Sequence, residues 1–201
     1  MPQALAQAGL EAPAHVEVLD AHSSEIVDAA EGWERLLWAV SNVLAGNPIT
    51  NPAVRVGGRI EVRASVPTLA AVAGDCDVYV GGVRARPWRA VPLPPGSTVR
   101  VEARGGSAYL ALRGLRARAL SVGRGLRLLV SAVTGFEDVV ARYVPESLLR
   151  AFESNGTTVD ELIHRVARHV HLACEMVRSG AKLIKVRVGN AVYEMWVKEV
   201  E

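Results

Sequence analysis

The chain has 201 residues, half of them hydrophobic and 22% charged, which describes one large or two small globular domains that need no disulfide or metal staple. Its apolar runs are far shorter than the ~20 residues of a membrane-spanning helix, and residues 1–13 lack the basic start of a secretory signal. The net charge is small, at +2, and the two cysteines, Cys76 and Cys174, are too few and too far apart for a disulfide framework or a cysteine zinc site. We therefore expect a cytoplasmic protein with no membrane contact.

The first quarter of the chain predicts a loose terminus, a strand and a helix. Residues 1–14 are rich in Ala, Gln and Pro without periodicity, and residues 15–20 alternate as a first strand. Gly46 is expected to cap the helix that follows, and Pro48 ends it. Its apolar residues recur at helical spacing as one stripe that we expect to face the core: Trp33, Leu36, Leu37, Val40, Val43 and Leu44.

Residues 52–130 predict a β domain, because short β-branched runs are punctuated by Gly and Pro at intervals of roughly ten residues. Gly81-Gly82 and Gly105-Gly106 look like tight hairpin turns. The prolines at 92, 94 and 95 exclude a central strand there. The expected strands are 53–56, 59–64, 68–72, 77–80, 83–86, 98–103 and 108–113.

Two helices are predicted after this domain. The first begins at residues 144–146, runs to about Phe152 and is ended by Asn155-Gly156. Thr158 and Glu161 form a capping box for the second, which Gly180 stops.

A β-hairpin is predicted at the end of the chain. Strands 183–188 and 191–197 are joined by Gly189-Asn190, and their free edges suit pairing with a second copy. We therefore divide the chain into a flexible terminus at 1–14, a β-barrel domain at 15–130 and an α+β extension at 131–201.

Charge is distributed unevenly along the chain. Residues 1–80 carry 4 basic and 10 acidic side chains, whereas residues 81–130 carry 10 arginines and a single acid, Glu102. Arginine suits phosphate and carboxylate, so this block either faces an anionic partner such as nucleic acid or pairs with the acidic block of the same molecule. Nucleic acid is the less favoured partner, because the block holds only Trp88 and Tyr109 as stacking aromatics.

Three histidines form the one cluster of metal-ligand residue types. On a helix, His164 and His169 differ by about 140° and His169 and His171 by about 200°, while His164 and His171 lie ~10 Å apart along the axis. No two of them can share a metal as an i, i+4 pair does, so we predict no metal site.

Asp75, Cys76 and Asp77 form a polar group at the head of a strand, where a catalytic carboxylate or thiol can sit. Turn formation and core packing explain the same residues. Phosphate-loop and nucleophile-elbow patterns are absent from the sequence. The residues alone therefore assign no catalytic group.

A series of landmarks extends over residues 15–125. In order, residues 41–48 read SNVLAGNP, 73–75 AGD, 86–89 RPWR after Gly82, 95–96 PG, 106–114 GSAYLALRG and 121–124 SVGR. The series resembles the biotin-dependent carboxyltransferase-like family, which includes one of the subunits of 5-oxoprolinase and one of those of allophanate hydrolase. The family's long loop between first strand and helix is absent, Arg55 stands where a glutamate is usual, and much of the second half is missing. The chain is thus similar to a shortened and divergent member.

The resemblance implies a fold that is mostly β with α: a cyclophilin-like β-barrel with an N-terminal helix and the helix-plus-hairpin extension. It implies a subunit or binding module, acting with a second protein subunit or as a homo-oligomer on a cyclic amide or urea-type substrate. A small carboxylate or amide would be the ligand, ATP would be used by the partner, and no cofactor would bind directly. An active subunit of an ATP-dependent 5-oxoproline hydrolase is the alternative, so whether the chain is an enzyme stays open.

The matched positions supply candidate substrate-binding residues. We expect Arg89 in particular to hold a substrate carboxylate bidentately, since it follows an aromatic residue. Structural roles also suit these residues: turns for the glycines, a helix cap for an asparagine and core packing for the aromatics. The full set is Asn42, Asn47, Gly74, Trp88, Arg89, Tyr109 and Gly114.

Overall fold

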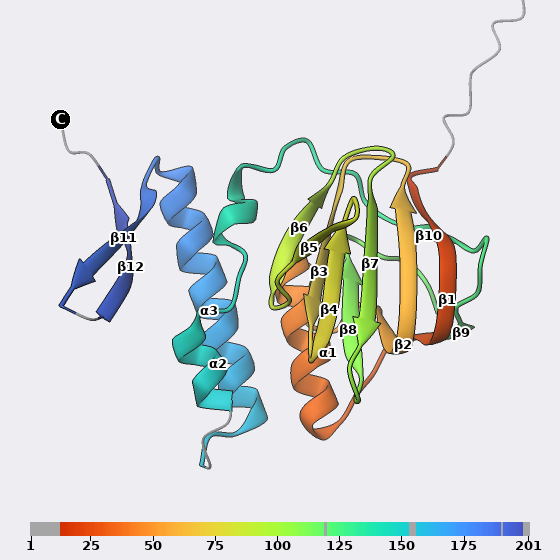
Figure 1. Cartoon of the computed structure of the whole chain (residues 1–201), viewed down its shortest axis with the longest axis horizontal. Helices are drawn as coiled ribbons and strands as arrows, with labels where there is room; N and C mark the ends of the chain where they lie inside the picture. The colour runs from red at the N-terminus through yellow and green to blue at the C-terminus, as the bar shows by residue number, and fades with distance from the viewer. Residues whose placement is uncertain (1–12, 119, 153–155, 190, 199–201) are drawn as a thin grey trace, which may run out of the picture.

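The computed structural model describes residues 13–118, 120–152, 156–189 and 191–198 (Figure 1). Most of the predicted loose terminus at 1–14, together with Asn155 and Asn190, lies outside these residues. The strands and helices before the extension are β1 (His15–Val27), α1 (Gly32–Ala45), β2 (Ala53–Ala64), β3 (Thr68–Ala73), β4 (Cys76–Val80), β5 (Val83–Ala85), β6 (Arg89–Leu93), β7 (Thr98–Ala103), β8 (Ala108–Leu112), β9 (Leu120–Ser121) and β10 (Arg127–Leu129). The extension contains a 3-10 helix η1 (Glu137–Ala141), α2 (Glu146–Phe152), α3 (Val159–Arg178), β11 (Lys182–Val188) and β12 (Ala191–Val197).

The main sheet forks at β2. One edge of β2 pairs with β1 over its whole length, while the other edge pairs with β8 through residues 54–56 and with β7 through residues 59–63. The strand order is β5-β4-β7-β2-β8-β3-β6, so β7-β4-β5 and β8-β3-β6 form two wings on the same side of β2. The result is a curled half-barrel, mostly β with three α-helices, in agreement with the predicted cyclophilin-like fold with a helix and a hairpin extension.

Two hydrophobic cores lie on opposite faces of this sheet. The first fills the concave side with valine, isoleucine and leucine, and the second lies between the sheet and the helices. Strand β3 contributes to both, because alternate side chains of a strand point to opposite faces. Ala70 and Val72 belong to the first core, Ala71 and Ala73 belong to the second, and all six residues of β3 are buried.

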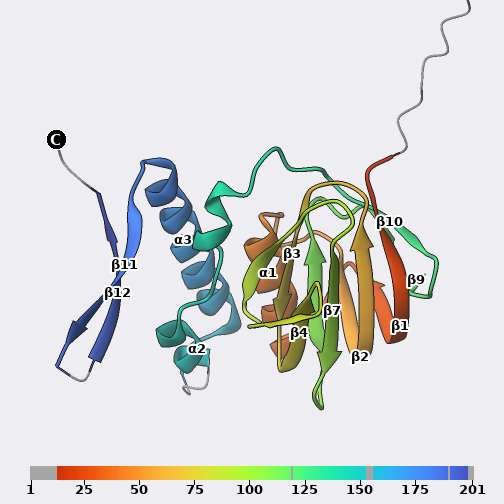
Figure 2. The ribbon, with the colours of Figure 1, turned by 45° about the horizontal axis from the view of Figure 1, so that its top comes forward.

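Helix α1 packs on the sheet, α3 packs on α1, and the β11–β12 hairpin lies beyond α3 (Figures 1 and 2). The predicted C-cap of α1 is confirmed, since Gly46 has a left-handed φ of 75°. Thr158 also caps α3 as predicted, by accepting a hydrogen bond from the Glu161 amide at 3.2 Å. Among the described residues, no helix is both long enough and apolar enough to cross a membrane.

The extension is attached to the edge of the sheet at β6. The Ala90 amide donates to the Arg142 carbonyl at 2.8 Å, and the Val144 amide donates to the Trp88 carbonyl at 2.9 Å. Arg89 and Tyr143 form a bridge between these two contacts. Residues 142–144 therefore cover the outer edge of β6 and fix where α2 begins.

The structure corrects one predicted turn of the β domain and adds one strand. Gly105-Gly106 is not a hairpin turn, because β7 and β8 pair with different halves of the same edge of β2 and not with each other. Gly105 does have a positive φ of 134°, but here it serves a loop that carries the chain from one half of β2 to the other. The structure also contains a strand that the sequence did not predict, β6, around Pro92. It is the last strand of its wing, so the prediction that the prolines exclude a central strand is confirmed.

The predicted ends of several strands also shift. β1 extends to Val27, seven residues beyond the predicted end, and the two expected strands at 53–56 and 59–64 are one, β2. A register shift between His22 and Ser24 accommodates the bend where β2 passes from one partner to the other. The sequence predicts that one strand ends before Gly57 and the next begins after Gly58, whereas β2 continues through both glycines.

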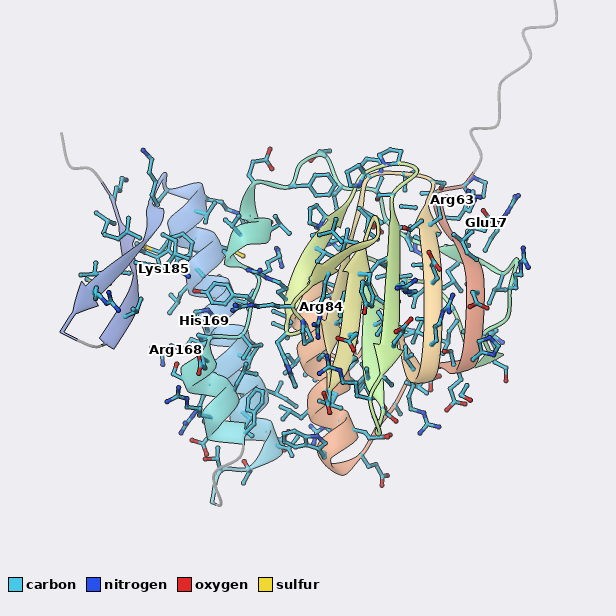
Figure 3. The ribbon with its side chains drawn as sticks, in the orientation of Figure 1. Glu17, Arg63, Arg84, Arg168, His169 and Lys185 are labelled. Atoms are coloured by element: carbon cyan, nitrogen blue, oxygen red, sulfur yellow. The ribbon has the colours of Figure 1, made fainter. Side chains whose placement is uncertain are left out.

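Ion pairs line the solvent-facing side of β1 and β2. Arg63, for example, donates to Glu17 at 2.6 Å. This pair lies at the opposite end of the molecule from Arg168 and His169 on α3 and Lys185 on the hairpin (Figure 3). Exposed pairs of this kind contribute little to stability, so this surface of paired charges is a solvated face.

Replacing Gly74 by alanine should destabilise the fold more than replacing Gly105. Both glycines have a positive φ, 127° and 134°, but an added Cβ at 74 would lie 2.9 Å from the Ala108 Cα, whereas at 105 it meets nothing within 4 Å. The two substitutions therefore carry a similar cost from the positive φ, and only the one at Gly74 adds a steric clash. We expect Gly74→Ala to lose roughly 1–3 kcal/mol more of the unfolding free energy in urea than Gly105→Ala; equal losses would contradict the close approach.

Candidate ligand-binding cavity

A cavity of about 780 Å³ lies between the first turns of α1 and the β4–β5 hairpin. Its size is that of a small-molecule site. Four separate segments form its wall, and Asp75, Cys76 and Asp77 all lie on it. The lining residues are Trp33, Glu34, Leu37, Gly74, Asp75, Cys76, Asp77, Arg84, Ala85, Arg86, Pro87, Trp88, Arg104, Gly106 and Ser107.

Glu34 is held in place from below the cavity. The buried Tyr109 hydroxyl donates to its carboxylate at 3.0 Å, and Arg55 lies 3.4 Å away. Partial burial alone would raise the pKa of Glu34, but hydrogen bonds from Ser107 and Tyr109 and the charge of Arg55 lower it below its ordinary value. Glu34 is therefore an ionised, oriented hydrogen-bond acceptor at neutral pH.

Asp77 forms ion pairs with two of the three arginines that line the cavity. Arg84 donates to it at 2.6 Å and the Arg104 Nε donates at 2.8 Å, and the hydrogen bond from Arg104 is the main cause that lowers the pKa of Asp77. Among the described residues, Arg86 forms no hydrogen bond and no close ion pair, although its charge contributes to the lowered pKa of Glu146. Its guanidinium is thus the cationic group of the wall that stays open to a ligand.

Cys76 is in no state to act as a nucleophile. Its thiol is 3% exposed, and burial together with the charges of Asp75 and Asp77 raises its pKa to about 12. Thiol nucleophiles react as thiolates. At neutral pH Cys76 is therefore a protonated, packed side chain of the cavity wall.

Gly74, Trp88 and Tyr109 are the predicted site residues that the structure brings to this cavity. Gly74 and Trp88 line it, while Tyr109 lies beneath Glu34. Trp88 has a left-handed φ of 63°, which a residue with a side chain rarely adopts. Burial and the hydrogen bond to Glu34 raise the pKa of Tyr109, so its hydroxyl stays a donor.

Asn42, Asn47 and Gly114 lie together elsewhere, where the end of α1 meets the end of β8. The Asn47 side chain donates to the Asn42 Oδ1 at 3.0 Å and to the Leu112 carbonyl at 2.9 Å, and accepts from the Gly114 amide at 2.8 Å. Asn42 is fully buried and donates to the Asn51 carbonyl. These contacts join helix to sheet, and none of the three residues lines the cavity described above.

Arg89 is exposed on β6 and is not among the residues that line the cavity. Its backbone pairs with Val72 and bridges to Tyr143. The carboxylate-binding role of Arg89 stays a prediction, and the nearby arginine that does line the cavity is Arg86.

Sequence reasoning missed Trp33, Glu34 and Arg86 as site residues. Trp33 was assigned to the core stripe of α1, but it is 49% exposed and lies on the cavity wall. It is the first member of the stripe, one turn before the helix reaches the buried part of the sheet. No sequence pattern marks Glu34 or Arg86. The residues that contact Glu34 are Tyr109 and Arg55, which are distant from it in the sequence. Arg86 is one of ten arginines in its block and does not stand out among them.

Part of the arginine block is engaged within the molecule. Arg84 and Arg104 pair with Asp77, Arg100 lies 3.2 Å from Glu102, and Arg113 donates to the carbonyls at the end of α1. The two pairs with Asp77 follow the intramolecular interpretation, because Asp77 belongs to the acidic block, whereas Glu102 lies within the arginine block itself. Nucleic-acid binding stays an untested prediction.

The predicted histidine cluster is spread over α3. His164 and His171 are exposed, and His169 packs edge-on against Tyr143 at 5.3 Å between ring centroids. Within the described ranges, no three His, Cys, Asp or Glu side chains are placed to hold a metal ion.

The sequence matches no protein-family description and no curated protein. Solved structures do share the fold. TTHA0988 superposes with a TM-score of 0.51 at 21% identity, over 61% of this chain and 32% of that one. The Kluyveromyces lactis urea carboxylase superposes with a TM-score of 0.50 at 18% identity, over 59% of this chain and 14% of that one. The K. lactis urea amidolyase superposes with a TM-score of 0.54 at 16% identity, over 68% of this chain and 11% of that one. This chain spans a third or less of each of these three, and the likeness is one of fold.

The Asn47 contacts predict a purely structural role. Asn47→Ala leaves the Gly114 amide and the Leu112 carbonyl without their partner, so we expect a loss of about 1–3 kcal/mol in the free energy of unfolding, measured in urea. The exposed Thr50→Ala, three residues away, serves as control and should lose almost nothing. An Asn47→Ala protein of unchanged stability would disprove the role.

The state of Cys76 predicts a loss of stability at high pH. Between pH 9 and about 12 the unfolded thiol, with an ordinary pKa of 9.0, releases its proton while the native thiol, with a pKa of about 12, keeps it. The unfolded state then binds fewer protons, so the free energy of unfolding falls as pH rises, by about 1.4 kcal/mol per unit. Urea titrations from pH 8.5 to 10.5 should show this slope reduced in Cys76→Ala; parallel curves would refute it.

Proposed function

We propose that this chain is a carboxyltransferase-like binding module whose cavity takes a small ligand that combines a carboxylate with an amide or urea N–H. The observation that carries the proposal is the chemistry of one wall: an open guanidinium on Arg86, an ionised acceptor on Glu34 and two indoles, Trp33 and Trp88. A guanidinium binds a carboxylate through a two-pronged hydrogen bond. An ionised carboxylate accepts from an N–H, and indoles cover a flat ring.

The proposal extends to a partner. The named neighbours, a urea carboxylase and a urea amidolyase, are far longer than this chain, which supports a module that works beside a second protein subunit. ATP, where the reaction uses it, would be bound by that subunit. The cavity of about 780 Å³ exceeds the volume of one small lactam, leaving room for a group from the partner.

Binding is favoured over catalysis by this chain alone. Proton transfer works best for a group whose pKa lies near the working pH. The pKa of Cys76 is raised to about 12, that of Tyr109 is raised and that of Glu34 is lowered, so all three move away from neutrality. The lactam hydrolase therefore remains the second candidate, with the partner supplying reactive groups.

Calorimetry with three compounds tests the proposal. 5-Oxoproline carries both the lactam and the carboxylate, 2-pyrrolidone carries the lactam alone, and proline lacks the amide. We expect 5-oxoproline to bind best. Arg86→Ala should weaken 5-oxoproline about tenfold or more, since a hydrogen bond to a charged group contributes about 1.5–3 kcal/mol, and should leave 2-pyrrolidone unchanged.

The matched control is Arg124→Ala, which removes an equally exposed arginine outside the cavity lining. It should change no affinity. Flat titrations with all three compounds, or equal effects of the two substitutions, would show that the cavity does not recognise this ligand class.

A further inference from the structure

Three aromatic rings from distant parts of the chain meet at the cavity, and we call them the aromatic triad: Trp33 of α1, Trp88 before β6 and Phe152 at the end of α2. The Phe152 ring lies 5.5 Å from the Trp88 ring and 6.1 Å from the Trp33 ring, between centroids. The chain has only four Trp, four Tyr and two Phe residues. Phe152 is the member of the triad that does not itself line the cavity, yet it contacts both indoles that do.

Trp88 holds its conformation at a cost. A left-handed φ of 63° is unfavourable by about 1–2 kcal/mol for a residue with a Cβ. Two backbone hydrogen bonds maintain it: the Trp88 amide donates to the Val72 carbonyl at 2.7 Å, and the Val144 amide donates to the Trp88 carbonyl at 2.9 Å. Strained backbone of this kind concentrates at ligand-binding sites.

These hydrogen bonds fix the backbone of Trp88 but leave its ring to be placed by packing. Helix α2 starts two residues after Val144, and Phe152 at its far end returns to the Trp88 ring. No residue of α2 is fully buried. Four of its residues, Leu148, Leu149, Ala151 and Phe152, pack partly buried on the second core, and Phe152 is the one whose ring contacts the two indoles.

We propose that Phe152 is a positioning residue of the ligand site: it holds the Trp88 indole against the cavity, so that the extension completes a site whose other walls belong to the β domain. The ligand part of this inference rests on the function proposed above. Phe152 acts through Trp88 and touches no ligand.

Fluorine NMR of the full chain labelled with 5-fluorotryptophan separates positioning from folding. The four resonances are assigned with single Trp→Phe variants. In Phe152→Ala the Trp88 and Trp33 resonances should shift, because both lose the ring current of Phe152, and the Trp88 resonance should also broaden, because the released indole exchanges among several positions. Those of Trp38 and Trp196 should stay unchanged. Ser147→Ala, an exposed change on the same helix, should move none of the four.

Calorimetry with 5-oxoproline supplies the second readout. Phe152→Ala should weaken binding about three- to tenfold, and Phe152→Leu, which keeps apolar bulk, should weaken it less. Wild-type affinity in Phe152→Ala, or a Trp88 resonance that stays as sharp as in the wild type, overturns the proposal. If the wild-type protein binds no 5-oxoproline, the proposed function fails, and the spectra alone then decide whether Phe152 places Trp88.

Discussion

The main sheet can be covered on its helix side only because that side is built largely from alanine. Ala71 and Ala73 of β3 and Ala111 of β8 let α1 approach closely while valine and leucine on the opposite face fill the half-barrel. Tyr109 is the large exception on β8, and it lies under the first turn of α1, where its hydroxyl reaches Glu34. The cavity thus lies where the alanines under α1 give way to Tyr109, beside the first turns of the helix.

The landmarks that resemble the carboxyltransferase-like family divide into two physical roles. Asn42, Asn47 and Gly114 satisfy polar groups where helix and sheet meet, and would be needed by any protein of this fold whatever it binds. Gly74 and Trp88 shape the cavity. A resemblance carried mainly by such residues identifies architecture, which is why the structural neighbours agree in fold at 16–21% identity.

Local patterns in the sequence predicted the elements well, and pairing across distance was the part they missed. The bounds of β7 and β12 and the cap of α1 follow from alternation and from Gly46. The fork of the sheet could not be predicted in this way, because a glycine with a positive φ, such as Gly105, suits a hairpin turn and a longer connecting loop equally well. Glu34 likewise becomes a site residue only through Tyr109 and Arg55, which no spacing connects to it. The cavity could therefore be predicted only in part.

Trp88 connects the β domain and the extension energetically. Its amide is bonded to β3 and its carbonyl to Val144, so the docking of both neighbours helps to maintain the unfavourable φ. Any ligand that binds better to the docked arrangement of the Trp88 indole must then strengthen the docking of residues 142–144 by the same free energy, because coupling between two sites is reciprocal. A partner that grips the extension would accordingly tighten the cavity without touching it.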